Sequence, residues 1–222
     1  MSARDVLSWA LRSFPEHKLA LLSAFGPGSL VLIHMLSELR VRLAVIFLDT
    51  LYHFPETLEH VERVRERYDL SLRVYRAAES RAAFEARHGP RLWERDLEAF
   101  QKLTKVEPFR RAVAGLDAYI TGRRRDQAPT RAGLETVEGT APVVINPLVS
   151  WTHDDVWRFI RENDVPYNPL HDDGYASIGD APLTTPVGDD EPERAGRWRG
   201  LGRLECGIHL LGHRTYDIGL GT

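Results

Sequence analysis

The sequence contains a single thiol, and its neighbours bear on whether that thiol is reactive. Cys206 is the only cysteine of the 222 residues, and it stands in the run Glu205-Cys206-Gly207-Ile208-His209. A lone cysteine is most often a small buried apolar residue. A glycine, a histidine and nearby arginines are unusual neighbours for such a core position, and cations lower the pKa of a thiol and so raise its thiolate fraction. The run therefore favours a reactive thiol over a packed one.

Having one cysteine excludes several kinds of site. The chain cannot form an intramolecular disulfide, and it cannot by itself supply the thiolates of a cysteine-ligated zinc or iron–sulfur site. A Cys–His pair also occurs in proteases, but no oxyanion-hole pattern or base-orienting residue accompanies Cys206. We therefore expect no metal site, and the residues alone leave the reaction of Cys206 open.

Arginines cluster in two segments. Four of them lie in the run 121–131, and another four, Arg194, Arg197, Arg199 and Arg203, precede the cysteine. Guanidinium groups bind phosphate and sulfate through paired N–H donors. The net charge of −3 argues against a general nucleic-acid binder. These clusters therefore predict a small anionic ligand, with a solvated basic surface as the alternative.

Two loops could approach an anion or a nucleotide. Segment 23–29 (SAFGPGS) has glycines that let backbone N–H groups come close to an anion, but it lacks the lysine of a Walker-type phosphate loop. Segment 49–57 begins at Asp49, whose carboxylate could accept a hydrogen bond from a ribose hydroxyl or a purine amino group. Pro55 and Glu56 also suit the first turn of a helix, so a helix cap is an equal interpretation of this segment.

The elements that must position these loops alternate along the chain. Apolar runs predict strands, and the patterns between and after them predict helices, as follows: strands at 18–24, 43–48, 70–75, 118–121 and 142–146, and helices at 29–38, 57–68 and 156–162. Thr152 and Asp155 form a capping box before the last helix. This order predicts an α/β fold with a doubly wound, mostly parallel sheet and helices on both faces. Ligands bind such sheets beyond the carboxyl ends of the strands.

The C-terminal part of the chain has a different texture. Residues 165–203 are rich in Gly, Pro, Asp and Arg with little periodicity, which is typical of a functional lid or a disordered tail. Aromatic residues such as Trp198 argue against full disorder. We therefore expect a nucleotide-binding part at 1–164 and an irregular, substrate-covering segment at 165–222 within one domain. No apolar run approaches the ~20 residues that cross a bilayer, and residues 1–14 lack a signal-peptide core, so we expect a cytoplasmic protein without a membrane partner.

Together these blocks resemble the sulfonucleotide reductases of sulfate assimilation. The resemblance runs from about residue 19 to residue 209 and is carried by SAFGPGS (23–29), DTLYHFPET (49–57), VYRAAES (74–80), KVEPFRRAV (105–113), TGRRRDQAPTRA (121–132), INPLVSWTHDDVW (145–157), PYNPLHDDGYASIGD (166–180), ERAGRW (193–198) and ECGIH (205–209). It implies a fold like that of the adenine nucleotide alpha hydrolases. It also implies that Cys206 attacks the sulfur of an adenosine phosphosulfate, and that reduced thioredoxin or glutaredoxin then releases sulfite from the S-sulfonate. The single cysteine agrees, because an outside dithiol must supply both electrons.

The resemblance also assigns substrate-binding residues. Lys105, Arg194 and Arg197 match the positions that hold the phosphosulfate group, where positive charge offsets the anionic substrate. The adenosine and its ribose are expected at Ser23, Phe25, Gly26, Ser29, Asp49 and Thr50, and Gly122 is a further expected substrate-binding residue. The remaining arginines, Arg123, Arg124 and Arg131, are expected to bind an outer phosphate. His209 either supports Cys206 or serves as a packing residue.

Two departures from the family pattern bear on the substrate. Members that reduce adenosine 5′-phosphosulfate (APS) typically hold a four-iron four-sulfur cluster, but the places of its cysteine ligands are taken by Phe100, Gln101, Asp180 and Leu183. This points to the cluster-free branch, which typically reduces 3′-phosphoadenosine 5′-phosphosulfate (PAPS), so we expect PAPS as substrate and no cofactor. Thr185 stands where an arginine is usual, so one substrate contact is lost or supplied elsewhere.

Alternatives to PAPS reduction remain open. The nearest is a cluster-free APS reductase, and a non-catalytic nucleotide-binding descendant of the family is another. An ATP-pyrophosphatase ligase would share the plan of loops and strands, but it usually carries a Gly-Gly-Lys-Asp-like loop where residues 25–29 here are FGPGS. The family often forms homodimers, which the resemblance carries over as an expectation.

Overall fold

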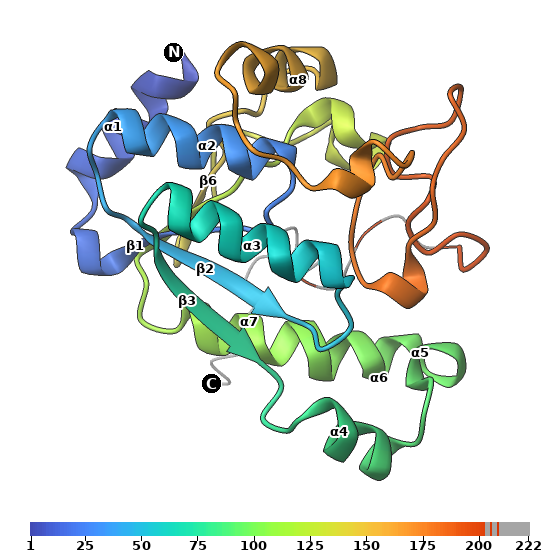
Figure 1. The fold of residues 1–222 in the computed structure, drawn as a ribbon. Helices are drawn as coiled ribbons and strands as arrows, with labels where there is room; N and C mark the ends of the chain where they lie inside the picture. The colour runs from blue at the N-terminus through green and yellow to red at the C-terminus, as the bar shows by residue number, and fades with distance from the viewer. Residues whose placement is uncertain (203–204, 206–207, 209–222) are drawn as a thin grey trace.

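The computed structural model of the protein describes residues 1–202, 205 and 208 (Figure 1). Cys206 and His209, the predicted catalytic residues, lie outside these residues. Among the described residues, no helix is both long and apolar enough to cross a membrane.

Six strands in the described part of the chain form one sheet in the order β3-β2-β1-β4-β6-β5. They are β1 (Leu19–Leu22), β2 (Ala44–Asp49), β3 (Ser71–Arg76), β4 (Ala118–Ile120), β5 (Val137–Glu138) and β6 (Val143–Ile145). Neighbouring strands are parallel except β5, which is antiparallel to β6. The chain moves outward from β1 to β3 and then returns to β4 on the other side of β1, so the strand order reverses between β1 and β4. The predicted α/β class and the five predicted strands are confirmed, and β5 is an addition.

Helices cover both faces of this sheet (Figure 1). One face is covered by α1 (Ala3–Ser13), α2 (Pro27–Glu38), α3 (Pro55–Arg67) and α8 (His153–Glu162), and the other by α7 (Glu107–Val113). Because successive side chains of a strand point to opposite faces, Leu21 packs with the first group of helices whereas Ala20 packs against Ala112 of α7. Strands buried on both faces are nearly all apolar, which is why β1 and β2 could be predicted from sequence.

The segment between β3 and α7 folds into short helices that the sequence did not predict. They are α4 (Arg81–His88), α5 (Leu92–Arg95) and α6 (Leu97–Gln101), and a π-helical turn at Lys102–Val106 joins α6 to α7. A proline in a regular helix clashes with the carbonyl four residues before it, and here Pro108 would meet Thr104. The turn directly before Pro108 is wider, with the Glu107 N–H donating to the Lys102 carbonyl. Such turns are frequent at functional sites, and this one carries Lys105.

The described part of the C-terminal segment lacks long elements, as predicted, but it packs on the body of the protein. Its regular structure consists of 3₁₀ turns at Pro169–His171 and Ala181–Leu183 and of single bridges that pair His53 with Asp180 and Thr184 with Arg197. Trp198 is 2% exposed and belongs to an apolar cluster with Tyr52, Phe84, Phe100 and Leu183. This cluster anchors the segment beside α4–α6. The predicted capping box at the start of α8 is also present.

Candidate active site

A cavity of about 240 Å³ lies beyond the carboxyl ends of β1, β2 and β4, where the strand order reverses. The three loops that the sequence singled out meet there. The predicted binding residues that line the cavity are Ser23, Phe25, Gly26, Ser29, Thr50, Lys105, Gly122, Arg123, Arg131, Arg194 and Arg197. Asp49 and Arg124 are not among the lining residues. The carboxylate of Asp49 instead accepts a hydrogen bond from the Leu51 N–H at 2.9 Å and pairs with Arg76 at 3.5 Å.

Two glycines allow the loops after β1 and β4 to meet. A Cβ atom placed on Gly28 would lie 2.5 Å from the carbonyl oxygen of Gly122, and one placed on Gly122 would lie 2.6 Å from the carbonyl carbon of Gly28. No real side chain tolerates such distances from backbone atoms, so both positions require glycine. The contact brings the N-terminus of α2, where backbone N–H groups can receive an anion, against the end of β4.

The first loop is held by its own hydrogen bonds and by the core. The hydroxyl of Ser23 accepts a hydrogen bond from the Phe25 N–H at 2.9 Å. Phe25 has a φ of 56°, which is uncommon for a bulky residue, and its ring packs edge-on against Phe47 and His60. Pro27 occupies the first turn of α2, which therefore begins two residues before the predicted start.

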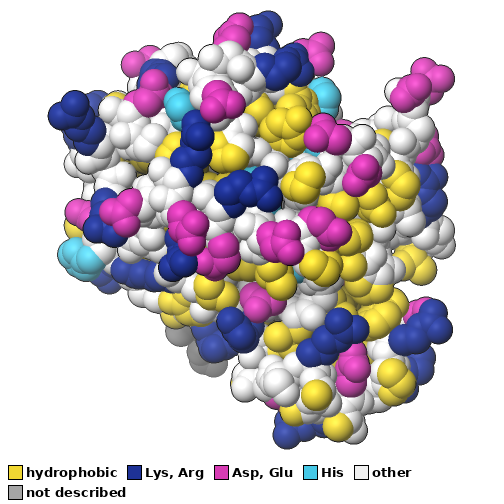
Figure 2. All heavy atoms as spheres, in the orientation of Figure 1, with side chains coloured by type: hydrophobic (Ala, Val, Ile, Leu, Met, Phe, Trp, Pro, Cys, Tyr) yellow, Lys and Arg dark blue, Asp and Glu magenta, His cyan; other side chains and the backbone are white. Residues whose placement is uncertain are grey.

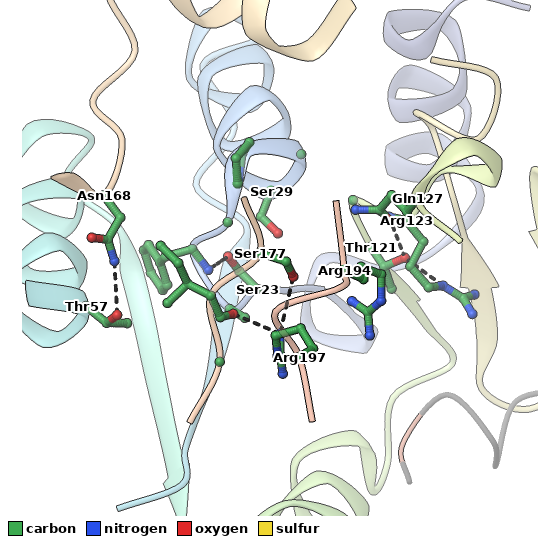
Figure 3. Close-up of a pocket in the computed structure, with 18 of the residues that line it drawn as sticks. Ser23, Ser29, Thr57, Thr121, Arg123, Gln127, Asn168, Ser177, Arg194 and Arg197 are labelled. Atoms are coloured by element: carbon green, nitrogen blue, oxygen red, sulfur yellow. Dashed lines mark hydrogen bonds between the residues drawn. The ribbon is translucent and has the colours of Figure 1, made fainter. Parts of the chain in front are cut away.

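The cavity is also lined by Lys105, Arg194 and Arg197, the three cations that the resemblance assigned to the phosphosulfate group. Figure 3 shows Arg194 and Arg197 on the C-terminal segment, between the first loop and Arg123. Arg197 donates to the Ile178 carbonyl at 3.0 Å and to the Ser177 hydroxyl at 3.4 Å. The guanidinium carbons of Arg197 and Arg194 lie 4.6 and 5.5 Å from the ring centre of Trp198, within the range of cation–π contacts. Lys105 completes the group from the π-helical turn.

Lys105 has a buried counter-ion that the sequence did not reveal. Its Nζ lies 2.5 Å from Oδ2 of Asp180, whose side chain is fully buried. Burial alone raises the pKa of Asp180, but the charges of Lys105 and His53 outweigh it and hold the pKa below its ordinary value. Burial lowers the pKa of His53. The Nζ of Lys105 therefore faces an ionised carboxylate at the cavity.

The four positions where the family's cluster-binding members carry cysteines do not fit an iron–sulfur cluster in this chain. Phe100 and Leu183 belong to the apolar cluster around Trp198, and Asp180 pairs with Lys105. None of these side chains is a thiolate. Within residues 1–202, 205 and 208, no group of three or more His, Cys, Asp and Glu side chains could hold a metal ion.

The arginines expected at an outer phosphate all have carboxylate partners. Arg123 pairs with Glu138 at 2.6 Å. Arg124 pairs with Asp126 at 3.0 Å and with Glu193 at 2.6 Å. Arg131 pairs with Glu205 at 2.7 Å. All three arginines are buried. The sequence predicted a phosphate site from the cluster of arginines but did not predict these acidic partners. Two of them, Glu193 and Glu205, lie more than sixty residues away in the sequence.

Several residues that line the cavity were not predicted. Asn168 donates to the Thr57 hydroxyl at 3.0 Å, and both side chains are buried at one end of the cavity (Figure 3). His171 lies beside them, and burial lowers its pKa to about 4. Each belongs to a sequence block quoted above, but a polar residue in a turn has a structural explanation as good as a functional one. Only the fold brings them together.

Comparison with known proteins identifies close relatives. A family model described as the phosphoadenosine phosphosulfate reductase domain matches residues 18–186. The chain is 44% identical over 220 residues to a phosphoadenosine phosphosulfate reductase of Emericella nidulans, covering 94% of this chain and 71% of that protein. It is 42% identical over 211 residues to an adenosine 5′-phosphosulfate reductase of Anoxybacillus flavithermus, covering 93% and 89%.

Solved structures agree at the level of the fold. The crystal structure of phosphoadenylyl-sulfate (PAPS) reductase from Candida auris in a phosphate complex is 40% identical, with a TM-score of 0.76, covering 83% of this chain and 91% of that one. An FMN adenylyltransferase of Candida glabrata is 17% identical with a TM-score of 0.62, covering 92% and 74%. The second similarity concerns the fold alone.

Proposed function

The chain belongs to the phosphoadenosine phosphosulfate reductase family and is a sulfonucleotide reductase, and we propose that its substrate is PAPS, its nucleophile Cys206 and its electron donor thioredoxin. In the first step the Cys206 thiolate attacks the sulfur of the sulfuryl group. The bond from that sulfur to the bridging phosphate oxygen breaks, and its electron pair leaves with adenosine 3′,5′-bisphosphate. The product on the enzyme is a Cys206 S-sulfonate.

The second step uses an external dithiol. One thiolate of reduced thioredoxin attacks Sγ of the S-sulfonate, and sulfite leaves with the electron pair of the sulfur–sulfur bond. The second thiol of thioredoxin then displaces Cys206 from the mixed disulfide, which oxidises thioredoxin and restores the enzyme thiolate. The donor must be external, because the chain holds no second cysteine that could take part. Glutaredoxin is the alternative donor.

The observation that carries this proposal is the group formed by Lys105, Arg194 and Arg197 at the cavity. Their charge offsets that of a phosphosulfate and stabilises the charge that develops on the departing phosphate. The contact between Gly28 and Gly122 lies where the strand order changes between β1 and β4. We propose that the backbone N–H groups at the N-terminus of α2 bind the nucleotide there. The proposed nucleotide cavity is lined by Arg194, which precedes Glu205 and Cys206 in the sequence.

APS is the second candidate substrate, and one structural observation favours it. A 3′-phosphate needs a donor at the cavity, and the arginines expected there already pair with carboxylates. Arg123 nevertheless lines the cavity, and unlike Arg131 it does not donate to protein oxygens from all three guanidinium nitrogens within the described residues, so it is our candidate for the 3′-phosphate. Relatives of comparable identity carry either substrate in their names.

Sulfite release from PAPS and from APS, each with reduced thioredoxin, distinguishes the candidates. We expect kcat/KM to be at least ten-fold higher for PAPS, and Arg123→Gln to lower it for PAPS but not for APS. A preference for APS would make the protein a cluster-free APS reductase. If neither nucleotide yields sulfite with thioredoxin or glutaredoxin, the protein is a binding module. Light scattering during the same preparation tests the expected homodimer.

A further inference from the structure

Glu205 is a buried carboxylate whose partners Arg131 and Arg194 line the cavity, and each of its two oxygens accepts two hydrogen bonds. Arg131 donates to Oε1 through Nε at 2.7 Å and to Oε2 through Nη2 at 2.9 Å. The Thr130 hydroxyl donates to Oε1 at 3.1 Å, and Arg194 donates to Oε2 at 3.3 Å. The side chain of Glu205 is 8% exposed. The Glu205 carboxylate is therefore buried with hydrogen-bond donors at both of its oxygens.

This arrangement is more specific than the docking of a C-terminal segment requires. Removing a carboxylate from water is costly unless charged donors of good geometry surround it, and a bidentate arginine supplies that geometry. A nearby pair in the same segment, Arg199 with Glu191, keeps its partners 45% and 37% exposed. The segment thus has an ordinary surface ion pair and, next to the predicted nucleophile, a buried one.

Gln127 connects the buried pair to a second one. Its side-chain oxygen accepts a hydrogen bond from Arg131, and its amide donates to Glu193 at 3.4 Å. Glu193 in turn pairs with Arg124. The run 121–131 therefore holds the C-terminal segment at two acidic residues, Glu193 and Glu205. All three guanidinium nitrogens of Arg131, Nε, Nη1 and Nη2, donate to protein oxygens.

Glu205 directly precedes Cys206 in the chain, so whatever holds Glu205 sets the point from which the thiol-bearing peptide extends. We propose that Glu205 is a positioning residue, whose ion pairs with Arg131 and Arg194 fix the chain at the residue before Cys206. Arg131 then serves this anchor and does not bind the outer phosphate. The inference rests on the proposed function only for the nucleophilic role of Cys206.

The test compares Glu205→Gln, Arg131→Gln and the double variant, with Glu191→Gln as the matched control from the same segment. Steady-state turnover gives kcat and KM, and intact mass spectrometry follows Cys206 S-sulfonate formation in a single turnover without thioredoxin. We expect each single variant to lower kcat and the single-turnover rate ten-fold or more with KM within two-fold, because a small displacement of a reacting group has a cost of this size. The double variant should be no slower than either single one, since both break the same anchor. Glu191→Gln should match wild type.

Two further measurements keep the test decisive. Hydrogen–deuterium exchange of peptides spanning residues 203–210 requires no turnover, and it should rise at least five-fold in both single variants and not in Glu191→Gln. If wild type releases no sulfite, the proposed function fails while this exchange still tests the anchor. If Glu205→Gln does not fold, Glu205→Asp, which keeps the charge and shortens the side chain, should lower kcat at unchanged KM. The inference is overturned if exchange and kcat stay at wild-type values, if Arg131→Gln raises KM at unchanged kcat, or if Glu205→Gln lowers KM by freeing the arginines for substrate.

Discussion

The ammonium group of Lys105 and the carboxylate of Asp180 form a buried ion pair across seventy-five residues of sequence, at 2.5 Å. Lys105 comes from the π-helical turn before α7, and Asp180 comes from the C-terminal segment, at its bridge with His53. The pair therefore joins the body of the protein to the segment that supplies Arg194 and Arg197. It also fixes the position of Lys105 at the cavity.

Breaking this pair should destabilise the protein strongly. Asp180→Asn or Lys105→Met leaves one buried charge without its partner, which typically costs about 3–5 kcal/mol of the free energy of unfolding. The double variant Lys105→Met with Asp180→Leu should lose less than either single one. Urea denaturation at pH 7 measures all three, and Arg42→Gln, which removes the exposed pair with Asp69, should change stability by less than about 1 kcal/mol. Equal losses for Arg42→Gln and Asp180→Asn would contradict the importance of burial.

Buried histidines should make the protein sensitive to acid. Burial, with smaller contributions from Arg63 and His171, lowers the pKa of His60 to about 4. A histidine whose pKa is lower in the folded than in the unfolded protein favours the folded state above its unfolded pKa of about 6.5. That stability is lost as pH falls from about 6.5 toward 4.

His60→Leu should reduce this loss. Between pH 7 and pH 5 we expect the free energy of unfolding of wild type to fall by about 2 kcal/mol more than that of the variant. Denaturation by urea at the two pH values provides the comparison. Parallel losses in the two proteins would show that His60 does not contribute.

The glycine contact between the two loops gives a steric prediction. In Gly28→Ala the new methyl carbon would lie 2.5 Å from the Gly122 carbonyl oxygen, so the loops must separate. We expect a loss of about 1–3 kcal/mol in stability, as for other overpacked sites, and at least ten-fold weaker binding of adenosine 3′,5′-bisphosphate by calorimetry. Gly133→Ala is the matched control, since no atom lies within 4 Å of its added carbon. If Gly28→Ala behaves like Gly133→Ala, the contact is not required.

The role of Cys206 can be separated from nucleotide binding. Cys206→Ser should abolish sulfite release and S-sulfonate formation, because a serine hydroxyl is a far weaker nucleophile than a thiolate. Binding of adenosine 3′,5′-bisphosphate should remain within about three-fold of wild type, since the phosphate contacts we propose come from other residues. Sulfite release by the serine variant at the wild-type rate would exclude Cys206 as the nucleophile.

The sequence predicts the sheet well for a physical reason. A strand buried on both faces, such as β2, must be apolar at nearly every position, and that pattern needs no tertiary information. The helices between residues 81 and 113 escaped prediction because each is short and none has an apolar face that repeats over several turns. The start of α2 at Pro27 was also missed, although proline favours the first turn of a helix.

For the candidate site, the sequence predicts which loops meet but not how their charges are paired. The loops at Gly28 and Gly122 meet because the topology of a doubly wound sheet places strand ends together. Lys105 and Arg194 follow no strand, and only the family resemblance led us to expect them at the same cavity. The partners of Lys105 and Arg131 could not be predicted. An arginine that binds a ligand and one that binds Glu205 have the same side chain, and only the fold determines which acid it meets.

The two ion pairs that Gln127 connects, Arg124 with Glu193 and Arg131 with Glu205, act on the C-terminal segment as two linked binding sites. When one pair opens, the other keeps the free acid at a high effective concentration near its arginine, so it rebinds before the segment can leave. Release of residues 193–205 therefore requires both pairs to open at the same time, in addition to loss of the contacts of Trp198 and Asp180. Glu193 and Glu205 thus act together as a bivalent ligand of the run 121–131. Because both pairs are largely buried, salt should weaken this attachment less than it weakens the exposed pair of Arg199 with Glu191.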